Sequence, residues 1–128
     1  MTRNLVFVDS HVVDYQMLIS TFGADTQWVL LDADWDGVLQ IQAAAAGYEN
    51  LDSIQFISHG GPGSLYLGAT VLDSSNLYQY ENSLQVIGST LTATGDILFY
   101  GCNVAQGDLG RHFIERLAQI TGADVAAS

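Results

Sequence analysis

The chain has 128 residues, 48% of them hydrophobic, which is enough for one domain around one core. The chain has fourteen acidic residues, three arginines and no lysine, which gives a net charge of −11. This charge disfavours nucleic acid and anionic membrane surfaces as partners. The lone cysteine excludes an internal disulfide and a cysteine-rich zinc site, and no apolar run approaches the ~20 residues of a membrane-spanning helix.

The first half of the chain predicts strands and helices in alternation. Residues 5–8 form a continuous apolar run, as in a strand buried on both faces, and Asp9 and Ser10 follow it as candidate caps of a helix. That helix is expected to end at Gly23. The next expected elements are a strand over 28–31, a helix from an N-cap at Asp36 to Gly47, and a strand over 54–57.

The second half continues this alternation after a short β-hairpin. The expected elements are hairpin strands over 65–67 and 70–72, a helix over about 75–91, a strand over 97–100, a helix that ends at Gly122, and a strand that begins at 124. The pattern predicts a three-layer α/β/α sandwich whose mainly parallel sheet has about five strands. With no linker or repeat, residues 1–128 are interpreted as one domain, a fragment of a larger protein. No signal peptide is visible before the first strand.

Two chemically capable side chains follow predicted strands. His59 comes directly after the strand over 54–57, and Cys102 directly after the strand over 97–100. Functional groups gather at the carboxyl ends of strands in open α/β sheets, and neighbouring strands lie ~4.8 Å apart. If the two strands pair, an imidazole can therefore activate a thiol, as nucleophilic catalysis by cysteine requires. Taken singly, each residue is more often a structural one.

Glycines flank both candidate residues. Gly60 and Gly61 follow His59, and Gly101 precedes Cys102. Their backbone N–H groups are open to an approaching carbonyl oxygen, which makes them candidates for an oxyanion hole.

The segments that contain these residues resemble known families. An apolar strand ending in Ser58-His59-Gly60, followed by one ending in Gly101-Cys102, is similar to the caspase-like cysteine peptidases. The resemblance implies that His59 and Cys102 are the catalytic dyad, that the substrate is a peptide and that no cofactor is needed. Caspases carry Gln-Ala before the cysteine and continue beyond the fifth strand, whereas this chain has Tyr100-Gly101 and stops there.

Almost the whole chain also resembles a bacterial domain family of unassigned function. The matching segments are residues 5–10, 58–65, 100–102 and 121–128. Such domains usually lie near the start of very large secreted proteins with cadherin-like or RTX calcium repeats. This resemblance implies an exported or cell-surface location within a longer bacterial protein.

The caspase resemblance also bears on specificity. Caspases bind an aspartate side chain with arginines, one of which follows the first strand, where this chain has Asp9. A basic or small substrate side chain is therefore expected if Asp9 lines the pocket, with Ser58 as a second candidate substrate contact. Helix capping is the alternative role of Asp9.

Other signals are weaker. Asp32, Asp34 and Asp36 match the opening of an EF-hand loop, but the twelfth position is an alanine, so only a weak calcium site is conceivable and capping by Asp36 is favoured. His11 and His112 have no partner at metal-ligand spacing and are interpreted as ordinary surface or capping residues.

Two functions from different classes remain open at this stage. The first is a caspase-like cysteine endopeptidase that processes its own parent protein. The second is a non-catalytic folding or recognition module of an adhesin or RTX-type exported protein. Alkylation of the thiol distinguishes them, because only the peptidase needs a reactive Cys102 that depends on His59.

Overall fold

The fold is that of a computed structural model that describes residues 3–100 and 103–127. The elements in chain order are β1 (Asn4–Asp9), α1 (Tyr15–Ile19), β2 (Thr26–Leu31), α2 (Gly37–Ala45), β3 (Leu51–Ile57), β4 (Gly60–Gly61), β5 (Ser64–Leu67), β6 (Thr70–Asp73), the 3-10 helix η1 (Leu77–Tyr80), α3 (Glu81–Gly88), β7 (Leu91–Tyr100), α4 (Gly107–Thr121) and β8 (Asp124–Ala127).

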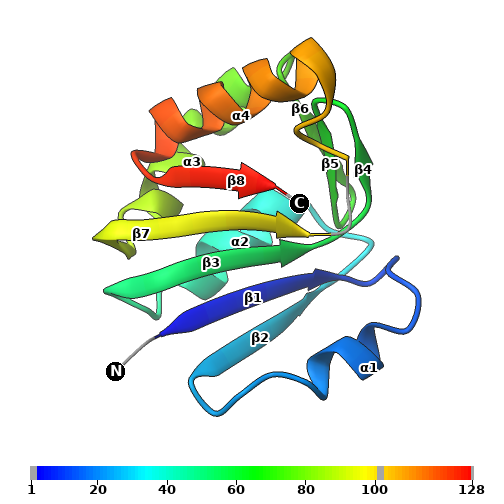
Figure 1. Cartoon of the computed structure of the whole chain (residues 1–128), viewed down its shortest axis with the longest axis vertical. Helices are drawn as coiled ribbons and strands as arrows, with labels where there is room; N and C mark the ends of the chain where they lie inside the picture. Colours follow the sequence, from blue (N-terminus) through cyan, green and yellow to red (C-terminus); the bar gives the residue numbers. More distant parts are fainter. Residues whose placement is uncertain (1–2, 101–102, 128) are drawn as a thin grey trace.

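The main sheet has five strands in the order β2-β1-β3-β7-β8, and every neighbouring pair is parallel. The step from β1 to β2 runs in one direction across the sheet, and all later steps run in the other. Right-handed crossovers therefore place α1 on one face and α2, α3 and α4 on the opposite face. Figure 1 shows α2 behind the central strands and α1 beside the β2 edge. The predicted three-layer arrangement is confirmed.

The hydrophobic core lies between the sheet and helices α2, α3 and α4. Phe7, Phe56 and Phe99 come from the three central strands and stack in sequence, with ring centroids 5.7 Å and 5.1 Å apart. The strand register aligns these three residues in one row, so each ring meets its neighbour on the same face. The stack forms the floor on which the helices pack.

A small antiparallel sheet covers one end of this core. Its strands β4, β5 and β6 contain the predicted hairpin, extended by the two glycines of β4. The hairpin buries Leu65, Leu67 and Leu72 against the core. Gly37 begins α2 directly beneath it, where an added Cβ would lie 2.2 Å from the Leu67 carbonyl oxygen. This close approach explains the glycine at that position.

Two sequence-based expectations are wrong. The helix after β1 is a single short element over Tyr15–Ile19, so neither Asp9 nor Ser10 caps it, and it ends at Ile19 instead of Gly23. The helix expected over about 75–91 ends at Gly88, and Leu91 opens β7 instead. The register of β7 against β3 is irregular near the start of β7, where Gly95 lies close to Leu51. Residues 91–95 therefore lack the regular strand pattern that would have predicted the longer β7.

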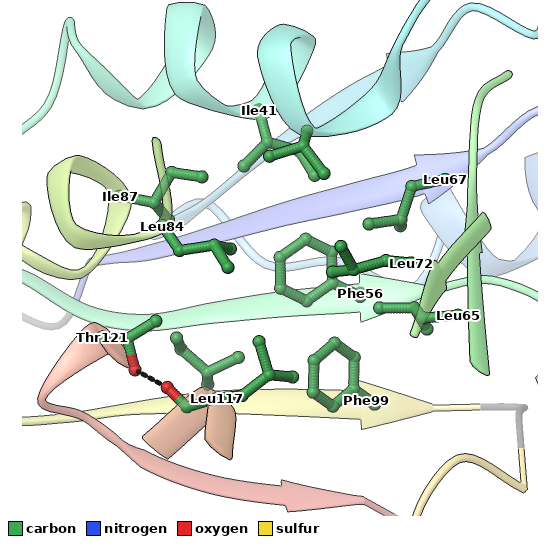
Figure 2. A pocket seen from close by; sticks show the side chains of 12 residues that line it. Ile41, Phe56, Leu65, Leu67, Leu72, Leu84, Ile87, Phe99, Leu117 and Thr121 are labelled. Carbon is green, nitrogen blue, oxygen red and sulfur yellow. Dashed lines mark hydrogen bonds between the residues drawn. The ribbon is translucent and has the colours of Figure 1, made fainter. Parts of the chain in front are cut away.

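Residues of the core line a small cavity of about 30 Å³. Figure 2 shows its apolar walls, which come from the sheet, the helices and the hairpin. Its one polar lining side chain, Thr121, donates its hydroxyl hydrogen to the Leu117 carbonyl at 2.7 Å. Apolar cavities of this size stay dry, and ligand pockets are roughly ten times larger, so this cavity is a packing defect.

Candidate functional site

The site is built on the carboxyl ends of β3 and β7. These two strands pair in parallel, and their last aligned residues are Ile57 and Tyr100. The Ser58 N–H donates to the Tyr100 carbonyl at 3.4 Å, one step beyond the last pair. The predicted adjacency of the two strands is therefore confirmed, and the segments that leave them start from the same edge of the sheet.

His59 is exposed at this edge, and its ring is held by backbone. Its Nε2 atom lies 3.2 Å from the carbonyl oxygen of His11, in the loop that follows β1. A carbonyl oxygen only accepts, so Nε2 carries the hydrogen and, in the neutral ring, Nδ1 carries the free lone pair. The His59 carbonyl in turn accepts the Tyr66 N–H at 2.9 Å, which ties this residue to β5.

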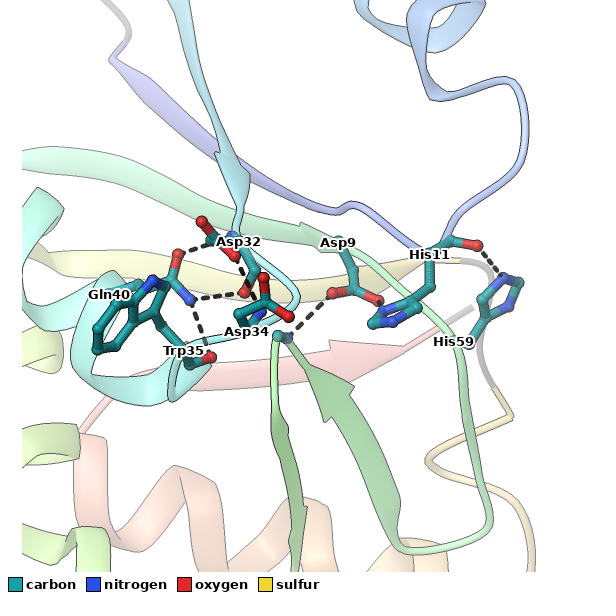
Figure 3. Close-up of polar contacts among 8 residues, drawn as sticks. Asp9, His11, Asp32, Asp34, Trp35, Gln40 and His59 are labelled. Carbon is teal, nitrogen blue, oxygen red and sulfur yellow. Dashed lines mark hydrogen bonds and ion pairs between the residues drawn. The ribbon is translucent and has the colours of Figure 1, made fainter.

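The last residue of β1, directly before this loop, has a buried carboxylate. Asp9 is 0% exposed; its Oδ1 accepts the Gly68 N–H at 3.0 Å, and its Oδ2 lies 2.9 Å from His11 Nδ1. Figure 3 shows the contacts that lead from Asp9 to the ring of His11 and from the His11 carbonyl to His59. Because both oxygens are engaged, Asp9 fixes the ring of His11, whose backbone carbonyl orients His59.

An open pocket of about 340 Å³ lies beside His59. Its lining consists of the two histidines and the turn and strands of the hairpin: His11, His59, Tyr66, Gly68, Ala69, Thr70 and Val71. Tyr66 and Val71 face each other across the hairpin and are 44% and 48% exposed. The pocket is thus large enough for a side chain of a bound peptide, and its described walls carry two imidazoles together with apolar and hydroxyl groups.

The sequence matches the family described as a domain of unknown function, DUF4347, over residues 5–128. The chain belongs to the DUF4347 family. No curated protein and no solved structure matches this DUF4347 domain. Within its described residues, no helix is long and apolar enough to cross a membrane.

The remaining predicted site residues of the DUF4347 domain occupy different environments. Gly60 and Gly61 pair with β5, and an added Cβ at Gly61 would meet no described atom within 4 Å. Ser58 is 2% exposed, and its Oγ has no hydrogen-bond partner among residues 3–100 and 103–127. Gly101 and Cys102 lie outside the described residues.

The acidic segment before α2 has a structural role. Asp36 Oδ1 accepts the N–H groups of Val38 and Leu39 at 2.9 and 3.2 Å, so the predicted helix cap is confirmed. Asp32 Oδ1 accepts the Asp34 N–H at 2.8 Å. In the part of the DUF4347 domain that the structure describes, no three histidine, cysteine, aspartate or glutamate side chains converge as metal ligands.

The sequence-based interpretation missed His11. His11 is exposed, as expected of a surface residue, but its contacts were not anticipated: its ring contacts Asp9 and its carbonyl contacts His59. One signal was present, because His11 follows the carboxyl end of β1, at the same edge of the sheet as His59. The pocket residues Tyr66 and Val71 carried no comparable signal.

Proposed function

We propose that this DUF4347 domain is a caspase-like cysteine peptidase with a His59–Cys102 dyad. The pairing of β3 with β7 carries the proposal. Ile57 is aligned with Tyr100, His59 follows the first of these residues by two positions, and Cys102 follows the second by two. Equal offsets from an aligned pair on neighbouring strands favour a meeting of imidazole and thiol at one edge.

The orientation of His59 suits the role of general base. Its Nε2–H is held by the His11 carbonyl, which leaves Nδ1 to accept the Cys102 thiol proton. The thiolate then attacks the peptide carbonyl carbon, and N–H groups of Gly60 and Gly101 bind the oxyanion, because the Gly61–Ser64 pair is the hydrogen-bonded one between β4 and β5. The imidazolium returns the proton to the leaving amine, and water hydrolyses the thioester.

The proposed substrate is a peptide segment, with a stretch of the same parent polypeptide as the first candidate. The pocket beside His59 favours an apolar or small side chain, because both carboxylate oxygens of Asp9 are already bound by Gly68 and His11. The acidic, lysine-free composition is compatible with the proposed exported or cell-surface location. In this context cleavage would serve the maturation of a large surface protein.

Thiol alkylation tests the dyad. Iodoacetamide is added to the folded domain at neutral pH, and modification of Cys102, the lone cysteine, is followed by mass spectrometry. We expect rapid labelling that slows by about tenfold or more in His59→Ala, because the neutral thiol reacts far more slowly than the thiolate.

His112→Ala is the matched control, since it removes an exposed imidazole from α4 and should leave the labelling rate unchanged. A rate that is the same in all three proteins, or no labelling of the folded domain, would refute the dyad and leave the non-catalytic module as the alternative.

A further inference from the structure

The face of the sheet opposite α2, α3 and α4 is unevenly covered: Val6 and Val8 of β1 are buried, whereas side chains of β2 and of the end of β7 are exposed. The strand register and the alternation of side chains place three rows on this face. The rows are Thr26, Asn4, Ser53, Asp96 and Asp124; then Trp28, Val6, Gln55, Leu98 and Ala126; then Leu30, Val8, Ile57 and Tyr100. We call these residues the open face. Figure 1 shows no helix across β1, β3 and β7 on the near side of the sheet.

The exposure of this face is unusual for a parallel sheet, whose two faces are normally both buried. Trp28, Leu30 and Tyr100 are 45%, 37% and 38% exposed, although all three belong to strands. The one helix on this side, α1, has no buried residue. An exposed tryptophan with further exposed apolar side chains on the same face is typical of a site that another molecule covers.

The charge of the open face indicates what covers it. Asp96 and Asp124 are aligned on the neighbouring strands β7 and β8, and among the described residues neither forms an ion pair. Like charges at aligned positions of neighbouring strands repel each other, and a cation placed between them relieves that repulsion. The surface is thus apolar across its middle and anionic at the end where the strands begin.

We infer that the open face binds a basic amphipathic helix of a partner protein. Helices are the elements that cover parallel sheets, and one that crosses the strands obliquely reaches from β2 to β8, about 19 Å, within about 13 residues. Its apolar side would contact Trp28, Leu30 and Leu98, and lysines or arginines at one end would reach Asp96 and Asp124. A second copy of this chain would bring another net charge of −11 against the same face. This inference is independent of the proposed peptidase activity.

Tryptophan fluorescence tests the inference. Trp35→Phe leaves Trp28 as the sole tryptophan. The probe is a synthetic helix of about five turns with leucine on one side and lysine on the other. We expect a saturable blue shift of Trp28 emission with reduced quenching by acrylamide. Asp96→Asn/Asp124→Asn should weaken binding about tenfold, and Leu30→Ser should weaken it by a similar factor.

Glu81→Gln/Glu115→Gln is the matched control, because it removes the same charge from α3 and α4 and should leave the affinity within about twofold. The inference is overturned if both double variants weaken binding equally, if a glutamate version of the helix binds as well, or if no shift occurs. It is also overturned if anionic lipid vesicles reproduce the shift, or if sedimentation shows that the domain covers Trp28 by self-association.

Discussion

At the scale of single residues, Asp36 shows how local and distant contacts combine. The cap on α2 could be predicted because donor and acceptor lie within three residues of each other. The other carboxylate oxygen accepts the Tyr80 hydroxyl at 2.6 Å from a residue 44 positions away. That hydrogen bond, and then partial burial, raises the pKa of Tyr80, because only the neutral phenol donates.

Tyr80→Phe should lower the free energy of unfolding by about 1 kcal/mol at neutral pH, since the contact is only partly buried. A raised pKa in the folded state stabilises the protein fully below the ordinary tyrosine value of about 10 and is lost as pH rises through the folded-state pKa. The difference between the wild type and Tyr80→Phe should therefore be constant up to about pH 9.5 and shrink above it.

Urea denaturation at several pH values measures this difference. Tyr78→Phe is the control, because Tyr78 is 68% exposed and should change stability little. A difference that grows above pH 10 would contradict the role assigned to the Tyr80 hydroxyl.

Asp9 marks the limit of sequence reasoning at this scale. A carboxylate directly after a strand is compatible with a helix cap, a substrate contact or a buried structural group. The last of these is observed, because its backbone partner Gly68 is 59 residues away. No local pattern encodes that partner. The position of His59 at the edge of the sheet could nevertheless be predicted, since its place after a buried strand is a local property.

At the scale of elements, the bounds of helices with clear caps could be predicted from the sequence. The boundary between a helix and a strand that continues its apolar spacing could not. Helix α2 begins directly after its predicted N-cap Asp36, and helix α4 ends directly before the predicted C-terminal Gly122. The segment before β7 was misassigned because Leu91 continues the apolar spacing of α3, while the chain has already turned after Gly88. Pairing of Leu91 with Leu51 on β3 is a tertiary contact that overrides the helical pattern.

Gly37→Ala tests the contact between α2 and the hairpin. Alanine improves helix propensity by up to about 1 kcal/mol, but its Cβ would lie 2.2 Å from the Leu67 carbonyl oxygen. The clash should dominate, and we expect a net loss of about 1–3 kcal/mol in a thermal or urea unfolding experiment.

Gly61→Ala serves as the comparison, because its Cβ would meet no described atom within 4 Å. Equal stability of the two variants would show that the hairpin moves away from α2 without cost.

At the scale of the whole molecule, the alternation of strands and helices predicted a parallel sheet but not its strand order. Several orders suit the same pattern, and only the order β2-β1-β3-β7-β8 is observed. The candidate site depends on that order, since it makes β3 and β7 neighbours. The open face also escaped prediction, because Trp28 and Leu30 belong to a run that indicates a strand buried on both sides.

The net charge of −11 should make stability depend on salt. The described ion pairs, Asp9–His11 and Asp108–Arg111, each include an exposed partner, so screening them costs little. Screening of the excess acidic charge should raise Tm between about 10 and 150 mM sodium chloride, as the Debye length falls from ~30 to ~8 Å.

Circular dichroism follows the transition, and a nonionic solute at matched osmolarity is the control. A Tm that falls with added salt would mean that attractive pairs outweigh the repulsion.

The stacked rings of Phe7, Phe56 and Phe99 have a consequence for the rim of the sheet. If β3 slipped by one residue along its neighbours, Phe56 would change faces and Gln55 would enter the core in its place. The packing of the rings thus disfavours the slip and determines which residues are aligned at the carboxyl ends of the strands. The packing of these rings in the core therefore fixes the alignment of Ile57 with Tyr100. His59 and Cys102 each follow one of these two residues by two positions.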